Sequence, residues 1–233
     1  MRRAYDLAQH LYCNFIEADG VPLVAHVTGV ASICARLNLS SELVAMACLH
    51  NVYTNGDFGD GRKKCATAFR RQLVRDAVGE TVESHVHRFP ALLRNGNDTL
   101  LSLGKRSDSL TPRDRQLLVI DLADVLEKCH DFGPLYYGGG EPLIDRYRRE
   151  GPDLAGLARD LGYPELAAAL SEAITALLSE SVPPSLRSRN TRQDYARQEI
   201  ALSHMRRPEI ATRRMMQRAW RKLRRAASPA APL

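Results

Sequence analysis

The chain has 233 residues, of which 44% are hydrophobic and 26% are charged, a composition sufficient for one large buried core with an appendage. No run of about 20 apolar residues is present, so no membrane span is expected. The net charge of +6 is unevenly placed, because residues 187–225 hold 13 Arg/Lys against 3 Asp/Glu and the remainder therefore carries −4.

Helical periodicity dominates the first ninety or so residues. Apolar residues three or four positions apart predict helices, and Gly20, Pro22 and a serine at 40 or 41 mark where helices end or begin. A glycine-rich loop over residues 55–61 breaks this pattern soon after a His-Asn pair. The helices predicted here cover residues 5–18, 22–37, 41–50, 67–78 and 81–93.

A polar stretch over residues 94–109 separates these helices from a second group. Thr111 followed by Pro112 predicts a helix start, with a hydroxyl cap and a proline in the first helical position. No alternating strand pattern is present, so we predict an all-α helical bundle. The helices predicted in this half cover residues 112–129, 141–161 (with an interruption at Gly151-Pro152 as an alternative) and 164–179.

A domain boundary is predicted at Val182-Pro183-Pro184-Ser185, which divides a helical domain of residues 1–180 from a basic extension of residues 181–233. Within the extension, residues 208–225 are expected to form a basic helix with Trp220 on its apolar face, followed by a disordered end. We favour a helix that closes the bundle. The alternatives are contact with an acidic partner or a second subunit (a homo-oligomer), and contact with nucleic acid or an anionic membrane surface; nucleic acid is not expected, because no binding motif is present.

The compartment is predicted from the cysteines and the N-terminus. The five cysteines are odd in number and form no C-x-x-C pair, which is typical of reduced thiols rather than of disulfides or a zinc site. The first residues lack the apolar core of a signal peptide. We therefore expect a cytoplasmic protein.

His26, His50 and Asp124 are polar residues within apolar helical stretches. Burying an unpaired carboxylate is costly, so a partner cation is a reasonable inference for Asp124. Two imidazoles and a carboxylate on packed helices are good ligands for a divalent ion, with Mn or Fe foremost. A single histidine in such a stretch is more often a core residue bonded to a backbone carbonyl, and the three residues together leave the two interpretations about even.

Three segments carry a family resemblance: Pro22-Leu-Val-Ala-His26, Ala47-Cys-Leu-His50-Asn51 and Val119-Ile-Asp-Leu-Ala-Asp124-Val-Leu. Over roughly residues 5–135 they resemble the HD-domain superfamily, closest to the hydrolase domain of the bifunctional alarmone (guanosine tetraphosphate) synthetase/hydrolases. The resemblance implies a compact helical fold and a metal bound by His26, His50, the residue at position 51 and Asp124.

The chain departs from this family pattern at the residues that would carry catalysis. Asn51 replaces the aspartate of the His-Asp pair, and Thr54 and Asn55 replace the acidic couple that activates water in the alarmone hydrolases. Asp57 or Asp60 is then a candidate general base, although turn-forming aspartates are commoner in such loops. The full candidate set is Asn51, Asp57 and Asp60 for catalysis, and Thr54, Asn55, Arg62 and Lys63 for substrate binding.

Three functions remain open at this stage. The leading hypothesis is a divergent HD-type hydrolase that acts on a small phosphorylated or anionic molecule through one divalent ion. The second is a catalytically lapsed domain, kept for ligand binding or interaction, in which the metal is lost. The third is a non-haem iron oxygenase, since two histidines and one carboxylate also suit Fe(II), with His85 or His87 as an extra ligand.

Overall fold

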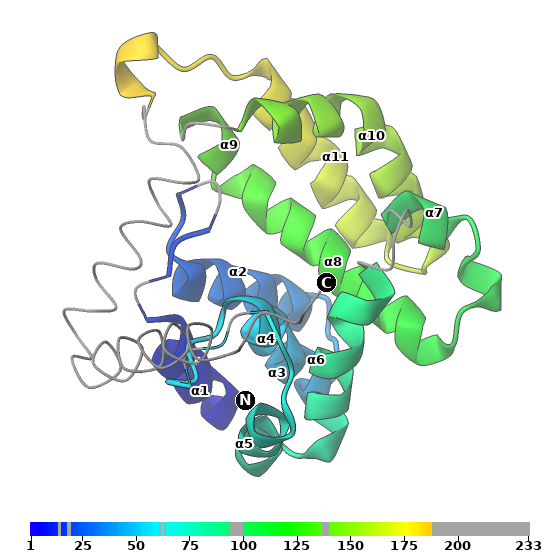
Figure 1. Ribbon diagram of the computed structural model, residues 1–233. Helices are drawn as coiled ribbons and strands as arrows, with labels where there is room; N and C mark the ends of the chain where they lie inside the picture. The colour runs from blue at the N-terminus through cyan, green and yellow to red at the C-terminus, as the bar shows by residue number, and fades with distance from the viewer. Residues whose placement is uncertain are drawn as a thin grey trace, which may run out of the picture.

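The computed structural model describes residues 1–13, 15–17, 20–60, 62, 64–93, 100–136 and 140–187. Over these residues the chain is helical, and a single isolated bridge between Ile16 and Pro22 is its only extended pairing (Figure 1). The predicted all-α class is therefore confirmed. The basic helix expected over residues 208–225 lies outside the described residues, and the boundary near residue 181 stays a prediction.

Six helices precede residue 94, and the local chemistry explains their limits. Ser40 and Thr67 each accept a backbone N–H through the side-chain oxygen, which caps the helices that follow them. The helices are α1 (Arg2–Tyr12), α2 (Leu23–Arg36), α3 (Ser41–Leu49), α4 (Val52–Asn55), α5 (Ala68–Val78) and α6 (Glu80–Leu93).

The second group is built around one long helix. Thr111 caps α8 by accepting the Asp114 N–H, as the sequence predicted. The helix over 141–160 is continuous through Gly151, which packs against Ile174, so the alternative interruption does not occur. The elements are α7 (Leu100–Gly104), η1 (Ser107–Ser109), α8 (Pro112–His130), α9 (Gly133–Tyr136), α10 (Glu141–Asp160), α11 (Pro164–Ser179) and η2 (Pro184–Leu186).

Two segments differ from the sequence predictions. The first helix ends at Tyr12 instead of residue 18, because the chain turns back on itself and the Glu17 N–H donates to the Val21 carbonyl oxygen at 2.8 Å. The polar stretch over residues 94–109, for which no helix is predicted, contains α7, whose Leu100 and Leu103 are buried. Both differences arise from packing that local propensity does not encode.

Helix α8 organises the core. Figure 1 shows it between the α1–α6 group and the α10–α11 pair, and it packs against α2 on one side and α11 on the other. Its apolar residues are almost completely buried, and every residue of α3 from Leu43 to Leu49 is buried. A helix that is hydrophobic on all sides must lie in the interior. Consequently, any polar side chain on α3 or on the inner face of α8 needs a specific partner.

Two ionic clusters fix the segments between α4 and α6. Arg70 is fully buried and binds both carboxylate oxygens of Asp60, with Nε to Oδ2 at 2.8 Å, and also the carbonyl oxygens of Arg62 and Cys65. Glu83, also fully buried, accepts hydrogen bonds from Tyr53, Arg71 and Arg75. A buried charge is tolerated only with such partners. The loop after α4 is therefore tied to α5.

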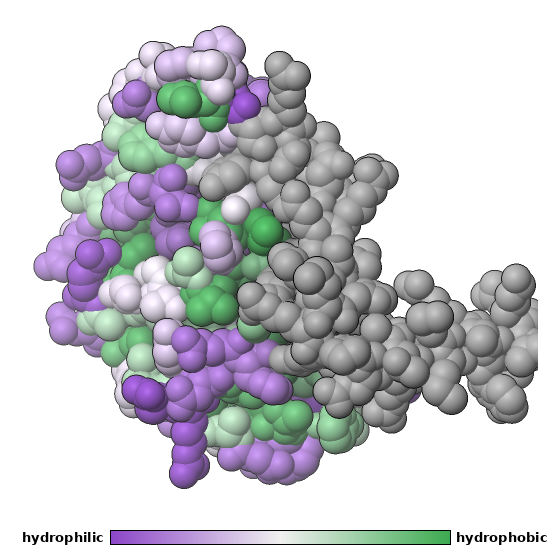
Figure 2. All heavy atoms as spheres, turned by 90° about the vertical axis from the view of Figure 1, so that its left-hand side faces the viewer, coloured by the Kyte–Doolittle hydropathy of each residue, from purple (hydrophilic) through white to green (hydrophobic). Residues whose placement is uncertain are grey.

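On the face shown in Figure 2, hydrophilic and hydrophobic side chains are interspersed over the described residues. Large exposed apolar residues are scattered singly, as Phe69 and Leu186 are. No helix in the described part of the chain is both long and apolar enough to cross a bilayer.

Candidate metal centre

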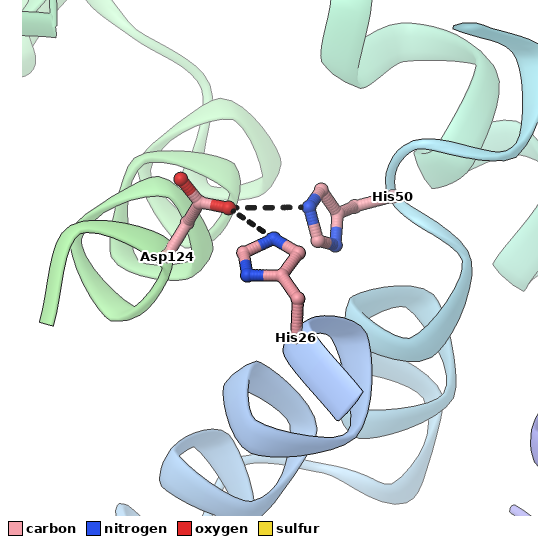
Figure 3. A group of neighbouring side chains, drawn as sticks. All are labelled: His26, His50 and Asp124. Atoms are coloured by element: carbon pink, nitrogen blue, oxygen red, sulfur yellow. Dashed lines mark ion pairs between the residues drawn. The ribbon is translucent and has the colours of Figure 1, made fainter. Parts of the chain in front are cut away.

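Three polar side chains from three different elements meet in the core. His26 lies in the first turn of α2, His50 follows the last residue of α3, and Asp124 lies in the middle of α8. Figure 3 shows the two imidazoles and the carboxylate directed at one another. One ligand atom of each residue lies within 4.8 Å of the others. Both histidines are almost completely buried, at 1% and 2% exposure.

The contacts converge on a single oxygen of Asp124. Its Oδ1 lies 2.8 Å from Nε2 of His26 and 3.3 Å from Nε2 of His50. The His26 and His50 rings meet edge to face with centroids 5.5 Å apart, and Phe89 of α6 packs against the other side of His50. The rings are thus held in orientations in which both Nε2 atoms face the carboxylate.

The opposite nitrogen of each imidazole is anchored elsewhere. Nδ1 of His50 lies 2.7 Å from the carbonyl oxygen of Ala47, and Nδ1 of His26 lies 2.5 Å from Oε2 of Glu127. An Nδ1–H that donates to oxygen leaves the Nε2 lone pair available for a metal ion. Nε2 of His26 is moreover buried without a hydrogen-bond partner among the described residues, despite its approach to Asp124. This donor set fits a divalent ion such as Mn, Fe or Zn.

Neighbouring charges set the protonation of the centre. Burial raises the pKa of Asp124, but the Lys128 and His26 charges outweigh burial and hold that pKa well below its ordinary value. Burial and Lys128 lower the pKa of His26, yet the carboxylates of Asp124 and Glu127 raise it to about 9. Without a metal, His26 is therefore an imidazolium at neutral pH.

The pKa of His26 predicts opposite pH dependences for stability and for metal binding. Because the folded pKa lies above the ordinary value of about 6.5, its contribution to stability is complete below pH 6.5 and is lost as the pH rises through about 9. An ion must displace the Nε2 proton, so metal affinity is expected to rise up to about tenfold per pH unit over the same range. Urea denaturation of the chelator-treated protein and metal titrations at pH 6–10 measure both, and two flat profiles would contradict this assignment.

Asn51 also reaches the centre. Its Nδ2 lies 2.8 Å from Nε2 of His50, so in the metal-free protein the amide donates to the imidazole. Asn51 precedes α4 and lies beside His50 in the wall of the adjoining cavity. An amide also carries a carbonyl oxygen, which is a weaker, neutral ligand than the carboxylate that it replaces.

A cavity of about 700 Å³ opens beside these residues. Thr54 and Asn55, two of the predicted substrate-binding residues, line it. Arg62 does not line it, and Lys63 lies outside the described residues. The other lining residues are Glu17, His50, Asn51, Lys64, Phe89, Pro90, Leu93, Leu100, Asp121, Asp124, Lys128, Pro142, Arg146, Arg149 and Glu150.

The two aspartates considered as general bases have structural partners in the loop. Oδ1 of Asp57 accepts the Gly59 N–H at 3.0 Å, an arrangement typical of turn-forming aspartates. Asp60 is bound to Arg70, which lowers its pKa, and it also accepts the Arg62 N–H. Neither side chain lines the cavity. The geometry therefore favours the turn interpretation for both residues.

The candidate extra histidines also lie apart from the centre. Nδ1 of His85 lies 2.7 Å from the Thr81 carbonyl oxygen of its own helix, and His87 contacts the Tyr53 ring. Neither lines the cavity.

Several residues at the metal centre and its cavity are not identified by the sequence alone. Most of them lie far along the chain from the residues that they approach, so no local pattern marks them; Gly29 and Glu127 each lie three positions from a predicted ligand. These residues are Glu17, Gly29, Glu127, Arg146 and Arg149.

Comparison with known proteins finds a match to one family model over part of the chain. Residues 4–94 match the family model of the HD domain, and HD domains bind divalent metals and form a superfamily that includes metal-dependent phosphohydrolases. The match contains His26, His50 and Asn51 but ends before α8, so Asp124 comes from a part of the chain that it does not cover. A search of the curated proteins finds no match. The finer resemblance to alarmone hydrolases stays a prediction.

Proposed function

We propose that this chain is a metal-dependent hydrolase that acts on a small phosphorylated or otherwise anionic molecule. The observation that carries the proposal is the convergence of His26, His50 and Asp124 within 4.8 Å, with His50 and Asp124 in the wall of a cavity of about 700 Å³. A divalent ion bound there would polarise a phosphoryl oxygen and lower the pKa of a bound water. The HD-domain match over residues 4–94 supports the same reaction class.

Cationic side chains in the cavity wall support an anionic substrate. Lys64, Lys128, Arg146 and Arg149 all line the cavity. Lys128 and Arg146 already have carboxylate partners, whereas Arg149 and Lys64 lie at the exposed rim. Lysine and arginine groups that face a partly enclosed cavity attract and orient phosphate or carboxylate groups.

Glu17 is our candidate for the general base. It lines the cavity and its Oε1 accepts a hydrogen bond from Asn55 Nδ2 at 3.3 Å. Asn55 stands where the resemblance places half of an acidic couple, so the turn after α1 brings a carboxylate from another segment to the same region. A glutamate held in this way can accept a proton from an attacking water.

Asn51 and Lys128 support a centre with one ion. Nζ of Lys128 donates to Oδ2 of Asp124 at 2.6 Å, so the second carboxylate oxygen already has a cationic partner. Burial disfavours the charged lysine, but Asp124 outweighs burial and raises its pKa, which keeps the group charged. With a neutral amide at position 51, little negative charge remains for a second ion.

The direct test is metal reconstitution followed by hydrolysis assays. The full-length protein, stripped with chelator and supplied with Mn²⁺, Fe²⁺, Co²⁺ or Zn²⁺, should retain about one ion per chain and hydrolyse phosphoesters such as p-nitrophenyl phosphate or nucleotides. The Glu17→Gln variant should retain the ion and lose most turnover. Failure of the wild-type protein to retain any of these ions would exclude the proposal.

Replacing Asn51 with aspartate is expected to strengthen metal binding by at least about tenfold, or about 1.4 kcal/mol. The carboxylate adds a charged ligand and removes the amide donor that occupies Nε2 of His50. Without metal, the same variant should be less stable, because two carboxylates then repel. Isothermal titration and thermal denaturation measure the two effects, with Asn55→Asp as the matched control; unchanged affinity would show that position 51 does not face the ion.

A catalytically lapsed ligand-binding domain is the second candidate. The observation that favours it is the set of contacts satisfied without a metal: Asn51 donates to His50, and Lys128 neutralises Asp124. This candidate predicts that anionic ligands bind the cavity equally well with and without metal, and that metal-loaded protein has no turnover. A non-haem iron oxygenase is the third candidate. Aerobic, Fe²⁺-dependent oxidation of a substrate would support it over the other two.

A further inference from the structure

The carboxylate of Glu127 lies directly behind the His26 imidazole. Its Oε2 is 2.5 Å from Nδ1, while Asp124 faces Nε2 on the other edge of the ring. Glu127 follows Asp124 by three positions on α8, so both side chains project from the same helix face. The Glu127 side chain is 12% exposed and that of His26 is 1% exposed, and the contact is therefore largely shielded from water.

Gly29 provides the space through which Glu127 reaches His26. It lies three residues after His26 on the same face of α2. A Cβ atom at position 29 would lie 2.7 Å from Cγ of Glu127, closer than real Cβ contacts allow, and 3.0 Å from its Oε1. A glycine inside a helix is destabilising relative to alanine. At position 29, the space left by the absent side chain is occupied by the side chain of Glu127.

The contact has a chemical consequence for a metal ligand. An Nδ1–H that is held by a carboxylate fixes the ring orientation and leaves Nε2 as the coordinating atom. The negative charge of the carboxylate also makes Nε2 of the imidazole a stronger electron-pair donor to a metal ion. Loss of such a partner typically weakens metal binding by about 10- to 100-fold.

We propose that Glu127 is a positioning residue of the metal centre, and that Gly29 is required because only a glycine lets Glu127 reach Nδ1 of His26. This inference rests on the metal site of the proposed function. Glu127 does not touch the ion or the substrate, and it acts through His26. The geometry therefore predicts that residue 29 controls metal affinity although its own side chain is absent.

The test compares Co²⁺ binding by isothermal titration, together with the Co²⁺ absorption spectrum, in the full-length wild-type protein, four single variants and one double variant. Glu127→Ala should weaken affinity by about 10- to 100-fold and alter the spectrum. Glu127→Gln retains an acceptor for Nδ1–H and should recover most of the affinity. Gly29→Ala should resemble Glu127→Ala, because the flexible glutamate is displaced. Gly156→Ala, on α10 with nothing within 4 Å, is the matched control and should bind as wild type.

Thermal denaturation of the metal-free variants separates positioning from folding. Gly29→Ala should fold normally yet bind weakly, and the Gly29→Ala/Glu127→Ala double variant should bind no more weakly than Glu127→Ala alone. Wild-type affinity and spectrum in Glu127→Ala, or additive losses in the double variant, would overturn the proposal. If Glu127→Ala does not fold, Gly29→Ala with unchanged affinity overturns it instead. Absence of Co²⁺ binding by the wild-type protein would instead show that the proposed function itself is wrong.

Discussion

Replacing His50 with alanine is expected to lower the affinity for a divalent ion by about 100- to 1,000-fold. Binding free energies of about 10 kcal/mol shared by three or four ligands correspond to roughly 3 kcal/mol for each of them. The remaining residues can compensate little for the lost ligand, because only Nε2 of His26 and Oδ1 of Asp124 are left of the three convergent ligand atoms. The variant should therefore lose the ion during dialysis against buffer.

Metal content after dialysis and isothermal titration measure this effect. His85→Ala is a matched control, because Nδ1 of His85 has the same contact with a helix carbonyl oxygen, at the same 2.7 Å, as Nδ1 of His50 has. That variant should retain the ion. Equal metal content in both variants would show that His50 is a core histidine without a ligand role. Denaturation of the two metal-free variants measures the stability lost through the cavity that the His50 side chain leaves. This loss can then be separated from the loss of metal affinity.

Replacing Asp60 with alanine should destabilise the protein by about 3 kcal/mol, because it leaves the buried guanidinium of Arg70 without its counter-ion. For a chain of this size, the expected fall in Tm is about 6–12 °C. The carbonyl oxygens of Arg62 and Cys65 still accept from Arg70, so the loss should lie at the lower end of the range for broken buried pairs. Metal affinity at low temperature should change little, since Asp60 does not line the cavity.

Asp6→Ala gives the matched comparison on the surface. The Arg2–Asp6 pair spans one helical turn, with side chains 87% and 54% exposed. Exposed pairs of this kind contribute less than about 1 kcal/mol. A similar small change in both variants would mean that the Asp60–Arg70 pair does not hold the loop. Loss of turnover in Asp60→Ala at unchanged Tm would restore Asp60 as the general base.

The helix limits show how much of the fold follows from sequence. The Thr67 and Thr111 caps, and the apolar spacing of α2, are set by atoms within one or two turns. Such interactions can be predicted because each residue and its partner are close in the chain. The end of α1 could not be predicted, because it depends on a backbone pairing between Ile16 and Pro22 across a turn.

The residues of the metal centre also differ in how far the sequence identifies them. His26, His50 and Asp124 stand out in the sequence because a polar residue in an apolar helical stretch needs a partner in the core. Glu127 does not stand out, because glutamate is ordinary in a helix and its partner lies 101 residues earlier. Asp57 and Asp60 are candidates for catalysis from the sequence, because the loop sequence does not show that Gly59 binds Asp57 and Arg70 binds Asp60.

The helical class, most helix boundaries and the choice of three polar residues in apolar helices follow from the sequence. Their convergence and the neighbours that orient them follow only from the packing of the helices: the carboxylate behind His26, the ammonium at Asp124 and the glycine that leaves room between α2 and α8. The physical reason is that helix formation depends on contacts within about four residues, whereas the charge and orientation of a buried side chain depend on whatever the packing of distant helices places beside it.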